Sequence, residues 1–288
     1  MAGIECFVPS MSGEDISITV ESLSRSSAFT GVTILSGVSL KSTETLRSIA
    51  EAVHEKFLLL YLKDMPLEMG MLALDRIISI AEDTKADMIY ADHYRIVEGE
   101  RRKHPVIDCQ KGALRDDFDF GSVLVFRTSS FRRAVRAMSE DYQWGALYDL
   151  RLRMKNIIHV NEYLYTEVET DNRKSGEKQF DYVDPKNRQV QIEMEKICTE
   201  HLKRIGAWLP PVFKDLSFTN QAFPVTASVI IPVFNRVRTI KDAVESALNQ
   251  KCDFPYNVIV VDNHSSDGTT LWKSSVGAPS ESRITTGA

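Results

Sequence analysis

Short apolar runs alternate with helix-like patterns through the first half of the sequence, and this alternation limits the fold more than any other feature. Residues Phe57–Leu62 form a continuous apolar run, which is typical of a strand buried on both faces. Amphipathic helical spacing precedes this run at Ser42–His54 and follows it at Met69–Glu82. Further strand-like runs lie at Ile4–Pro9, Val32–Leu35 and Met88–Tyr90. Strands that alternate with helices predict βαβ units, with ligand sites at the carboxyl ends of the strands.

The composition is that of a globular protein and excludes several classes. The 288 residues are 43% hydrophobic and 26% charged, which provides enough apolar surface for a folded core. A net charge of -5 and a pI near 5.8 count against nucleic acid as a partner, because such proteins carry a basic patch. A small phosphate-bearing ligand remains compatible, since it needs only a few local donors.

The sequence shows no clear pattern of a transmembrane helix, a signal peptide or paired cysteines. No apolar run approaches the ~20 residues of a transmembrane helix, and the N-terminus lacks a signal-peptide pattern. The four cysteines are scattered and form no CxxC pair. We therefore expect a cytoplasmic protein without a transmembrane segment, and leave open whether it associates with the surface of the inner membrane.

The pattern changes in the second half of the chain. A long amphipathic helix is predicted over residues 187–208 and is stopped by Pro210 and Pro211. A new strand, helix and strand follow at 227–232, 238–249 and 256–261. The last stretch has no periodicity and is rich in Ser, Thr, Gly and Ala. We therefore predict a first domain at 1–205, a linker at 206–225, a partial domain at 226–270, and a disordered or artificial tail at 271–288.

The segment 227–270 carries the most specific motifs. An apolar strand ends at Pro232 and is followed by Phe234-Asn235, the helix end SALNQ, and the Asp-rich turn DNHSSDG after the second strand. This segment resembles the opening of inverting glycosyltransferases of family 2, which have the GT-A fold. A generic Rossmann-like βαβ unit with a surface turn is the alternative interpretation.

The resemblance extends backwards more weakly, over the helix and strand at 73–100 and the strand and helix at 121–135. Residues 1–205 are thus similar to a complete but divergent GT-A domain, followed by the truncated start of a second one. The resemblance implies an α/β fold: a Rossmann-like mixed, mainly parallel sheet flanked by helices, plus a partial βαβ unit. A nucleotidyltransferase of similar topology is disfavoured, because no Gly-rich phosphate loop follows the first strand.

The resemblance also implies a function. The chain would transfer a sugar from a nucleotide-diphosphate sugar to a glycan or lipid-linked acceptor, in bacterial polysaccharide synthesis. The alternative is a non-catalytic GT-A-like module that scaffolds an active tandem domain. A homo-oligomer formed through the partial second domain is a further expectation.

The family pattern assigns roles to particular residues. Binding of the nucleotide sugar is expected at two sets of positions, Asp64 and Asp92 in the first domain and Pro232, Asn235, Asp262 and Asn263 in the second. The family's metal-binding Asp-x-Asp is reduced here to Lys63-Asp64, so Asp64 alone would hold Mg²⁺ or Mn²⁺. Lys63 is either a cation for the donor phosphates or an ordinary solvated residue.

The general base is also uncertain from the pattern. The family's Glu-Asp pair falls on Ala146 and Leu147, which leaves Asp141 and Asp149 as equal candidates. Each is otherwise an acid of a loop or helix start. Because these carboxylates are missing from the more complete domain, we expect the chain to be an enzyme of weak or undetectable activity.

Overall fold

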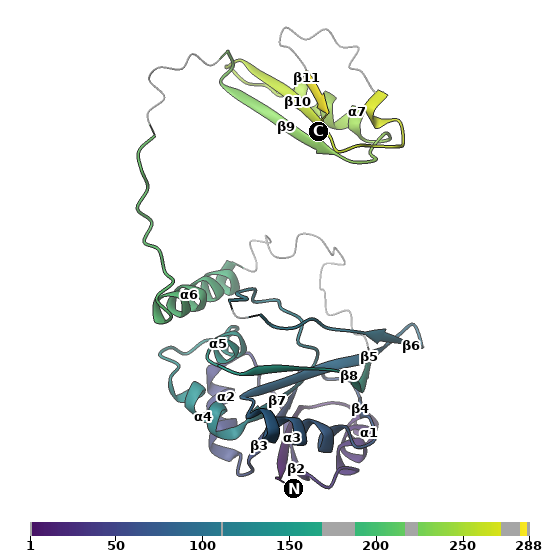
Figure 1. The fold of residues 1–288 in the computed structure, drawn as a ribbon, viewed down its shortest axis with the longest axis vertical. Coiled ribbons are helices and arrows are strands. Elements are labelled where there is room, and N and C mark those ends of the chain that lie inside the picture. Colours follow the sequence, from purple (N-terminus) through teal and green to yellow (C-terminus); the bar gives the residue numbers. More distant parts are fainter. Residues whose placement is uncertain (1, 111, 169–187, 217–223, 272–282, 287–288) are drawn as a thin grey trace. The chain divides into compact units, whose positions relative to one another are not determined.

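The computed structural model describes residues 2–110, 112–168, 188–216, 224–271 and 283–286. The chain divides into two compact units, an N-terminal unit at Met1–Pro210 and a C-terminal unit at Pro211–Ala288 (Figure 1). Each unit has its own sheet and its own core. We describe each unit separately.

The N-terminal unit is built on one eight-stranded sheet with the order β2-β1-β3-β7-β5-β8-β4, and β6 pairs with β5 beside this path. Strands β1, β2, β3, β5 and β8 run the same way, whereas β7 and β4 run against them. The sheet is therefore mixed and mainly parallel. The strands are β1 (Ile4–Pro9), β2 (Phe29–Leu35), β3 (Phe57–Tyr61), β4 (Leu67–Met69), β5 (Met88–Val97), β6 (Glu100–His104), β7 (Val123–Arg127) and β8 (Ile157–Val168).

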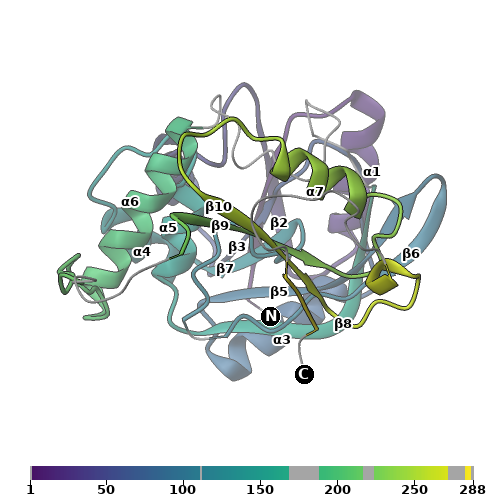
Figure 2. The same ribbon diagram turned by 90° about the horizontal axis from the view of Figure 1, so that it is seen from above.

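Helices cover both faces of this sheet (Figure 2). Residues of α1 (Gly13–Ser24) and α3 (Ala73–Thr84) pack into one core with alternate residues of β1, β3 and β7. Residues of α2 (Thr43–Ala52), α4 (Thr128–Arg136), α5 (Ala146–Leu152) and α6 (Arg188–Arg204) pack into the core on the other face. Because β3 contributes to both cores, its five residues are all apolar and all buried.

Helix α6 is fixed against the start of α5. Its Ile197 is fully buried, and its Glu193 carboxylate accepts the backbone N–H groups of Gly145 at 2.6 Å, Trp144 at 2.8 Å and Gln143 at 3.1 Å. A carboxylate at a helix N-terminus satisfies unpaired N–H donors and complements the helix dipole. This contact sets the position of the α5 side chains.

The C-terminal unit is small. Parallel strands β9 (Ala227–Val233) and β10 (Tyr256–Asp262) are joined through α7 (Ile240–Leu248), and β11 (Arg283–Thr286) pairs with the far side of β10. A short 3-10 helix, η3 (Thr269–Leu271), follows β10. Among the described residues of this unit, five apolar side chains form the buried core: Val233, Ile240, Val244, Val258 and Val260.

The predicted fold class is confirmed. Residues Phe57, Leu59, Ile77, Met88 and Val123, from the apolar runs and the helical pattern, are all at most 2% exposed. The parallel pairing of 227–232 with 256–261 is also as predicted. Strand β8 has an irregular register opposite β5. Much of the expected linker and tail, at 217–223, 272–282 and 287–288, lies outside the described residues.

None of the helices in the described part of the chain combines the length and apolar character that a membrane crossing requires.

Candidate functional site

A buried ion cluster lies at the carboxyl end of β3. Glu167 of β8 is the central residue: its Oε1 lies 2.7 Å from Lys63 Nζ, 3.0 Å from Arg95 Nε and 3.3 Å from His93 Nε2. Its Oε2 accepts a short hydrogen bond from the Ser122 hydroxyl. Lys63 follows β3, whereas His93 and Arg95 belong to β5. The cluster therefore connects the adjacent strands β5 and β8 to the end of β3, which lies on the other side of β7.

This cluster holds Glu167 in its charged form. Burial by itself raises the pKa of the carboxyl, but hydrogen bonds from His93, Lys63 and Ser122 outweigh burial and lower the pKa to about 2. The side chain of Glu167 is fully buried, and that of Lys63 is 20% exposed. Lys63 is thus paired and is not an ordinary solvated residue.

Gly121 lets the chain pass closely over the cluster. It has a φ of +71°, and a Cβ atom there would lie 2.2 Å from the Tyr165 hydroxyl. That hydroxyl accepts the backbone N–H of Ser122 at 3.0 Å, and the Tyr165 ring stacks on His93 at 4.8 Å. Only glycine fits this backbone conformation without strain.

A cleft of about 860 Å³ opens beside this cluster. Leu62 after β3, Arg95 of β5 and Gly121 before β7 lie on its wall, together with the first turn of α5 and part of α6. It is therefore at the edge where α/β sheets bind their ligands. Its polar and aromatic lining includes Lys41, Arg95, Asp116, Asp117, Asp119, Trp144, Tyr148 and Arg151.

Three aspartates line this cleft and differ in their hydrogen-bond partners. Asp119 lies 2.8 Å from His104 Nε2 and 3.4 Å from Arg95 Nη2; burial opposes ionisation, but these partners lower the pKa of its carboxyl. The hydrogen bond from Arg115 likewise lowers the pKa of Asp117. Asp116 is exposed and forms no hydrogen bond or ion pair with the part of the chain that the structure describes. Asp116 is therefore the carboxylate of the cleft that is available to a ligand.

Aromatic rings form much of the remaining wall. Trp144 is 41% exposed at the start of α5, and the Tyr148 hydroxyl donates to the Leu114 carbonyl at 2.5 Å. Phe118 and Phe120 lie with ring centroids 4.5 Å apart. Flat apolar surfaces beside a few polar groups are typical of small-molecule sites.

Asp64 lies outside this arrangement. It is exposed in the loop after β3, directly beyond Lys63. Divalent cations such as Mg²⁺ and Mn²⁺ require several oxygen ligands. Among the residues that the structure describes, no group of three His, Cys, Asp or Glu side chains could hold a metal ion. The residues around Asp64 therefore do not fit a bound divalent ion.

Asp92 is enclosed in the N-terminal unit. It is 1% exposed, and its Oδ1 accepts the Val106 N–H at 2.9 Å and lies 2.8 Å from His159 Nε2. His159 in turn contacts Asp108 at 2.7 Å and stacks on Tyr90. In this conformation Asp92 anchors the segment after β6 and does not line the cleft.

The two candidates for the general base are also separated from the cleft. Asp149 of α5 is 2% exposed and pairs with Arg153 at 2.8 Å. Asp141 is exposed and pairs with Arg47 of α2. Neither side chain lines the cleft in this conformation.

In the C-terminal unit, hydrogen bonds join the two loops that carry the predicted nucleotide contacts. Asp262 is buried and accepts from the Ser265 N–H at 3.1 Å and the Ser265 hydroxyl at 2.5 Å; these bonds lower the pKa of its carboxyl. Asn235, at φ +52°, accepts the Ser266 N–H at 2.8 Å. Pro232 and Asn263 are exposed at the same end of the strands.

The sequence interpretation missed the cleft residues Lys41, Arg95 and Asp116–Asp119. The run RDDFDF at 115–120 is visible in the sequence as a cluster of acids just before an apolar strand. A search for acids next to strands would have found it. Nothing local indicates Glu167, because its role depends on the pairing of β8 with β5.

The N-terminal unit is thus an α/β unit with a cleft at the carboxyl edge of a mixed sheet. Residues 228–272 match the Glycosyl transferase family 2, as the motifs predicted. This match falls within the C-terminal unit and supports a glycosyltransferase-like function.

Other proteins are similar over longer stretches. An uncharacterized protein, y4gI, of Sinorhizobium fredii (strain NBRC 101917 / NGR234) is 27% identical over 201 residues, which is 65% of this chain and 21% of that protein. The chain thus spans about a fifth of this relative.

Two solved structures are also similar. S. aureus TarS 1-349 in complex with UDP-GlcNAc has 12% identity and a TM-score of 0.46, covering 70% of this chain and 72% of that one. The mannosyltransferase PcManGT from Pyrobaculum calidifontis, in complex with GDP-Man and Mn²⁺, has 7% identity and a TM-score of 0.40, covering 73% and 65%.

Proposed function

We propose that the chain is a glycosyltransferase that moves a sugar from a nucleotide-diphosphate sugar to a glycan or lipid-linked acceptor in bacterial polysaccharide synthesis. The observation that carries this proposal is the match of residues 228–272 to family 2. The cleft of the N-terminal unit supports it, because it combines cations, a free carboxylate and aromatic rings at the carboxyl edge of the sheet.

In the N-terminal unit the donor would bind without a metal ion. The diphosphate of the donor carries negative charge that must be neutralised. Lys41 and Arg95 are the cations of the cleft that would neutralise it. Lys63 supports Arg95 indirectly, since both pair with Glu167.

A sugar transfer also needs a group that takes the proton of the acceptor hydroxyl. Asp116 fits this role better than Asp141 or Asp149, because it is exposed at the cleft and has no partner among the described residues. Trp144 offers a flat apolar surface for one face of a sugar ring.

In the C-terminal unit, Pro232, Asn235, Asp262 and Asn263 are the proposed nucleotide contacts. The bonds of Asp262 to Ser265 keep this turn in one shape, and the exposed Asn263 amide could both donate to and accept from a base edge. We also propose a cytoplasmic location, with association at the inner membrane surface left open, and a homo-oligomer formed through this unit.

A second candidate function is a non-catalytic module that positions an active tandem domain. Two contacts favour it: Asp149 is neutralised by Arg153, and the position next to Asp64 is taken by Lys63, which pairs with Glu167. In this case the cleft would bind a nucleotide sugar or acceptor without turnover.

The two candidates are separated by a donor-hydrolysis assay with a panel of UDP- and GDP-sugars, in EDTA and in Mn²⁺. Glycosyltransferase activity predicts slow release of nucleotide that Asp116→Asn abolishes. Binding without release in every condition would support the non-catalytic module. Absence of both binding and release would refute both candidates.

A further inference from the structure

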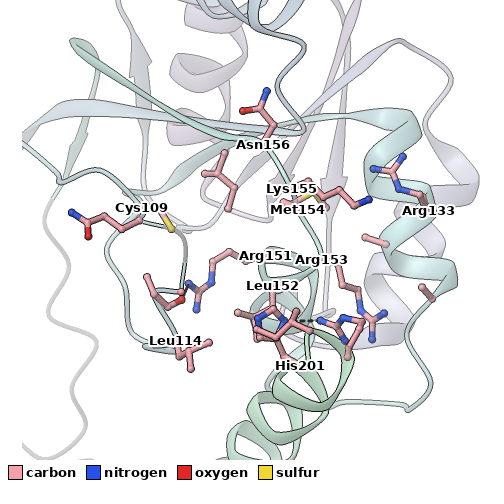
Figure 3. A pocket seen from close by; sticks show the side chains of 18 residues that line it. Cys109, Leu114, Arg133, Arg151, Leu152, Arg153, Met154, Lys155, Asn156 and His201 are labelled. Carbon is pink, nitrogen blue, oxygen red and sulfur yellow. Dashed lines mark hydrogen bonds between the residues drawn. The ribbon is translucent and has the colours of Figure 1, made fainter. Parts of the chain in front are cut away.

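A second cavity, of about 900 Å³, lies in the N-terminal unit away from the cleft (Figure 3). It is bounded by the C-terminal ends of α4 and α5, by the second half of α6, and by residues 109, 110 and 112–114. We call it the basic pocket, because six of its lining residues are basic: Arg133, Arg151, Arg153, Lys155, His201 and Arg204. It shares only Arg151 with the lining of the cleft.

The basic pocket has an excess of positive charge. Among the residues that the structure describes, its lining contains five Arg and Lys residues and no Asp or Glu. Two buried carboxylates outside the lining pair with them: Asp149 lies 2.8 Å from Arg153, and Asp87 lies 3.4 Å from Arg133. Five positive charges against two negative ones leave about three uncompensated, on a chain whose net charge is -5.

Three of these basic side chains differ in the protein groups that they already contact. Arg151 is 6% exposed and donates to the carbonyls of Ala113 at 2.8 Å and Arg115 at 2.7 Å, so it is fixed in the wall. Lys155 is exposed and forms no side-chain hydrogen bond or ion pair with the described residues. Arg204 contacts His201, through Nη2 and Nδ1 at 2.8 Å. Lys155 and Arg204 are therefore the cations available to a ligand.

The positive groups also affect one another. Burial and the charge of Arg153 lower the pKa of Arg204. Burial and the charges of Arg204 and Arg151 lower the pKa of His201, although Asp149 acts in the opposite direction. Figure 3 shows Arg153 and His201 on one side of the pocket and Arg151 on the side of Leu114. A bound anion would relieve this repulsion.

We propose that the basic pocket binds a phosphate-bearing ligand through a phosphate or diphosphate group. Guanidinium groups donate two parallel hydrogen bonds to phosphate oxygens, and lysine adds a point charge. A pocket of about 900 Å³ suits a compact anion better than a nucleic-acid backbone, which needs an extended basic surface. This site is additional to the proposed transfer reaction and does not depend on it.

The test is isothermal titration of the whole chain with inorganic pyrophosphate and with inorganic phosphate. We expect pyrophosphate to bind more tightly than phosphate, and the affinity to fall as salt is raised. The double variant Lys155→Ala/Arg204→Ala should weaken pyrophosphate binding at least tenfold. The charge-preserving variant Lys155→Arg/Arg204→Lys should keep it within about threefold, since only the geometry of the donors changes.

The matched control is Arg25→Ala/Arg102→Ala, which removes two positive charges at exposed positions outside the pocket. It should leave pyrophosphate binding within about twofold, because exposed charges are screened. Unmeasurable pyrophosphate binding by a folded chain would overturn the proposal. So would an unchanged affinity in the Lys155→Ala/Arg204→Ala variant, or an equal loss in the control.

Two further ligands identify the source of the phosphate. UDP represents a nucleotide, and an isoprenyl diphosphate represents a lipid-linked acceptor. The source is the ligand of these two that binds more tightly than pyrophosphate and loses affinity to the same extent in Lys155→Ala/Arg204→Ala. Such a result supports the proposal. Lys41→Ala changes the cleft only, so pyrophosphate binding that survives it assigns the anion to the basic pocket. A loss of pyrophosphate binding in Lys41→Ala alone would contradict the proposal.

Discussion

Nζ of Lys63, the residue directly before Asp64 in the chain, lies 2.7 Å from Oε1 of Glu167. The pair joins the end of β3 to β8, and Arg95 of β5 shares the same carboxylate oxygen. The residue next to Asp64 is thus a paired cation and not an acidic ligand for a metal ion. The ion pair between Lys63 and Glu167 therefore stabilises the edge of the sheet where β3 ends.

The first prediction concerns Glu167. Its pKa is lowered from the usual 4.5 to about 2, so its charge stabilises the fold above pH 4.5 and this contribution is lost as the pH falls toward 2. The shift corresponds to roughly 3 kcal/mol. Glu167→Gln should lower the free energy of unfolding at pH 7 by about that amount and flatten its pH dependence below pH 4.5, as measured by urea denaturation.

The control for this prediction is Glu162→Gln, which removes a carboxylate from an exposed pair with Arg76. Exposed pairs contribute about 0–1 kcal/mol. An equal effect of the two substitutions would show that Glu167 has no special role in the cluster.

The second prediction concerns Asp149. Its pair with Arg153 is nearly buried, so Asp149→Asn should lower the free energy of unfolding by about 2 kcal/mol and leave nucleotide-sugar affinity unchanged. Asp141→Asn, at an exposed pair, should change stability by less than about 1 kcal/mol. A loss of turnover in Asp149→Asn without a loss of stability would instead identify Asp149 as the general base.

The third prediction concerns Asp116. If the cleft carries out transfer, Asp116→Asn should lower kcat about 100-fold or more while KM stays within twofold, because a general base acts on the chemical step. Asp117→Asn is the matched control, since Asp117 is already paired with Arg115. Equal losses of kcat in both variants would argue that the charge of the loop matters and that Asp116 is not the base.

The fourth prediction concerns the pH dependence of pyrophosphate binding. His201 faces Arg204 on its own helix and Arg151, Arg153 and Asp149 from α5 and the residue after it, and its pKa is lowered. The pocket gains a charge when His201 is protonated, so affinity should rise as the pH falls below about 6.5. His201→Gln, titrated over the same pH range, reports the ionisation of pyrophosphate alone. Identical profiles would exclude His201 from the site.

The same lowered pKa has a consequence for stability. Between the unfolded value of 6.5 and the lower folded value, the unfolded chain binds a proton more readily than the fold does. His201 therefore lowers stability as the pH falls through this window and is neutral above it. His201→Gln should remove this part of the pH dependence of the melting temperature.

Much of the fold was predictable because its pattern is local. The run Phe57–Tyr61 is apolar throughout because both faces of β3 are covered, and α3 shows one apolar stripe. Strand β6 was missed for the opposite reason: its sequence ERRKH is charged and exposed, and it exists only as an antiparallel extension of β5.

The candidate site was less predictable, because it depends on pairing between distant strands. Arg95 is opposite Glu167 in the register of β5 with β8, and no local pattern contains that information. Asp92 was expected from the family pattern and Asp149 was a candidate for the general base, but both are buried against basic partners in the structure. Sequence spacing gives residue types near a site, whereas burial and pairing decide which of them can act.

We propose that the N-terminal unit binds a nucleotide sugar through its own cations and not through a metal ion. Calorimetric titration of the chain with UDP- and GDP-sugars, in EDTA and in Mn²⁺, tests this for the native chain and for Lys41→Ala. We expect one donor whose Kd agrees within twofold in the two buffers and is weakened about tenfold or more by Lys41→Ala. Binding that appears only with Mn²⁺, or that Lys41→Ala leaves unchanged, would contradict it.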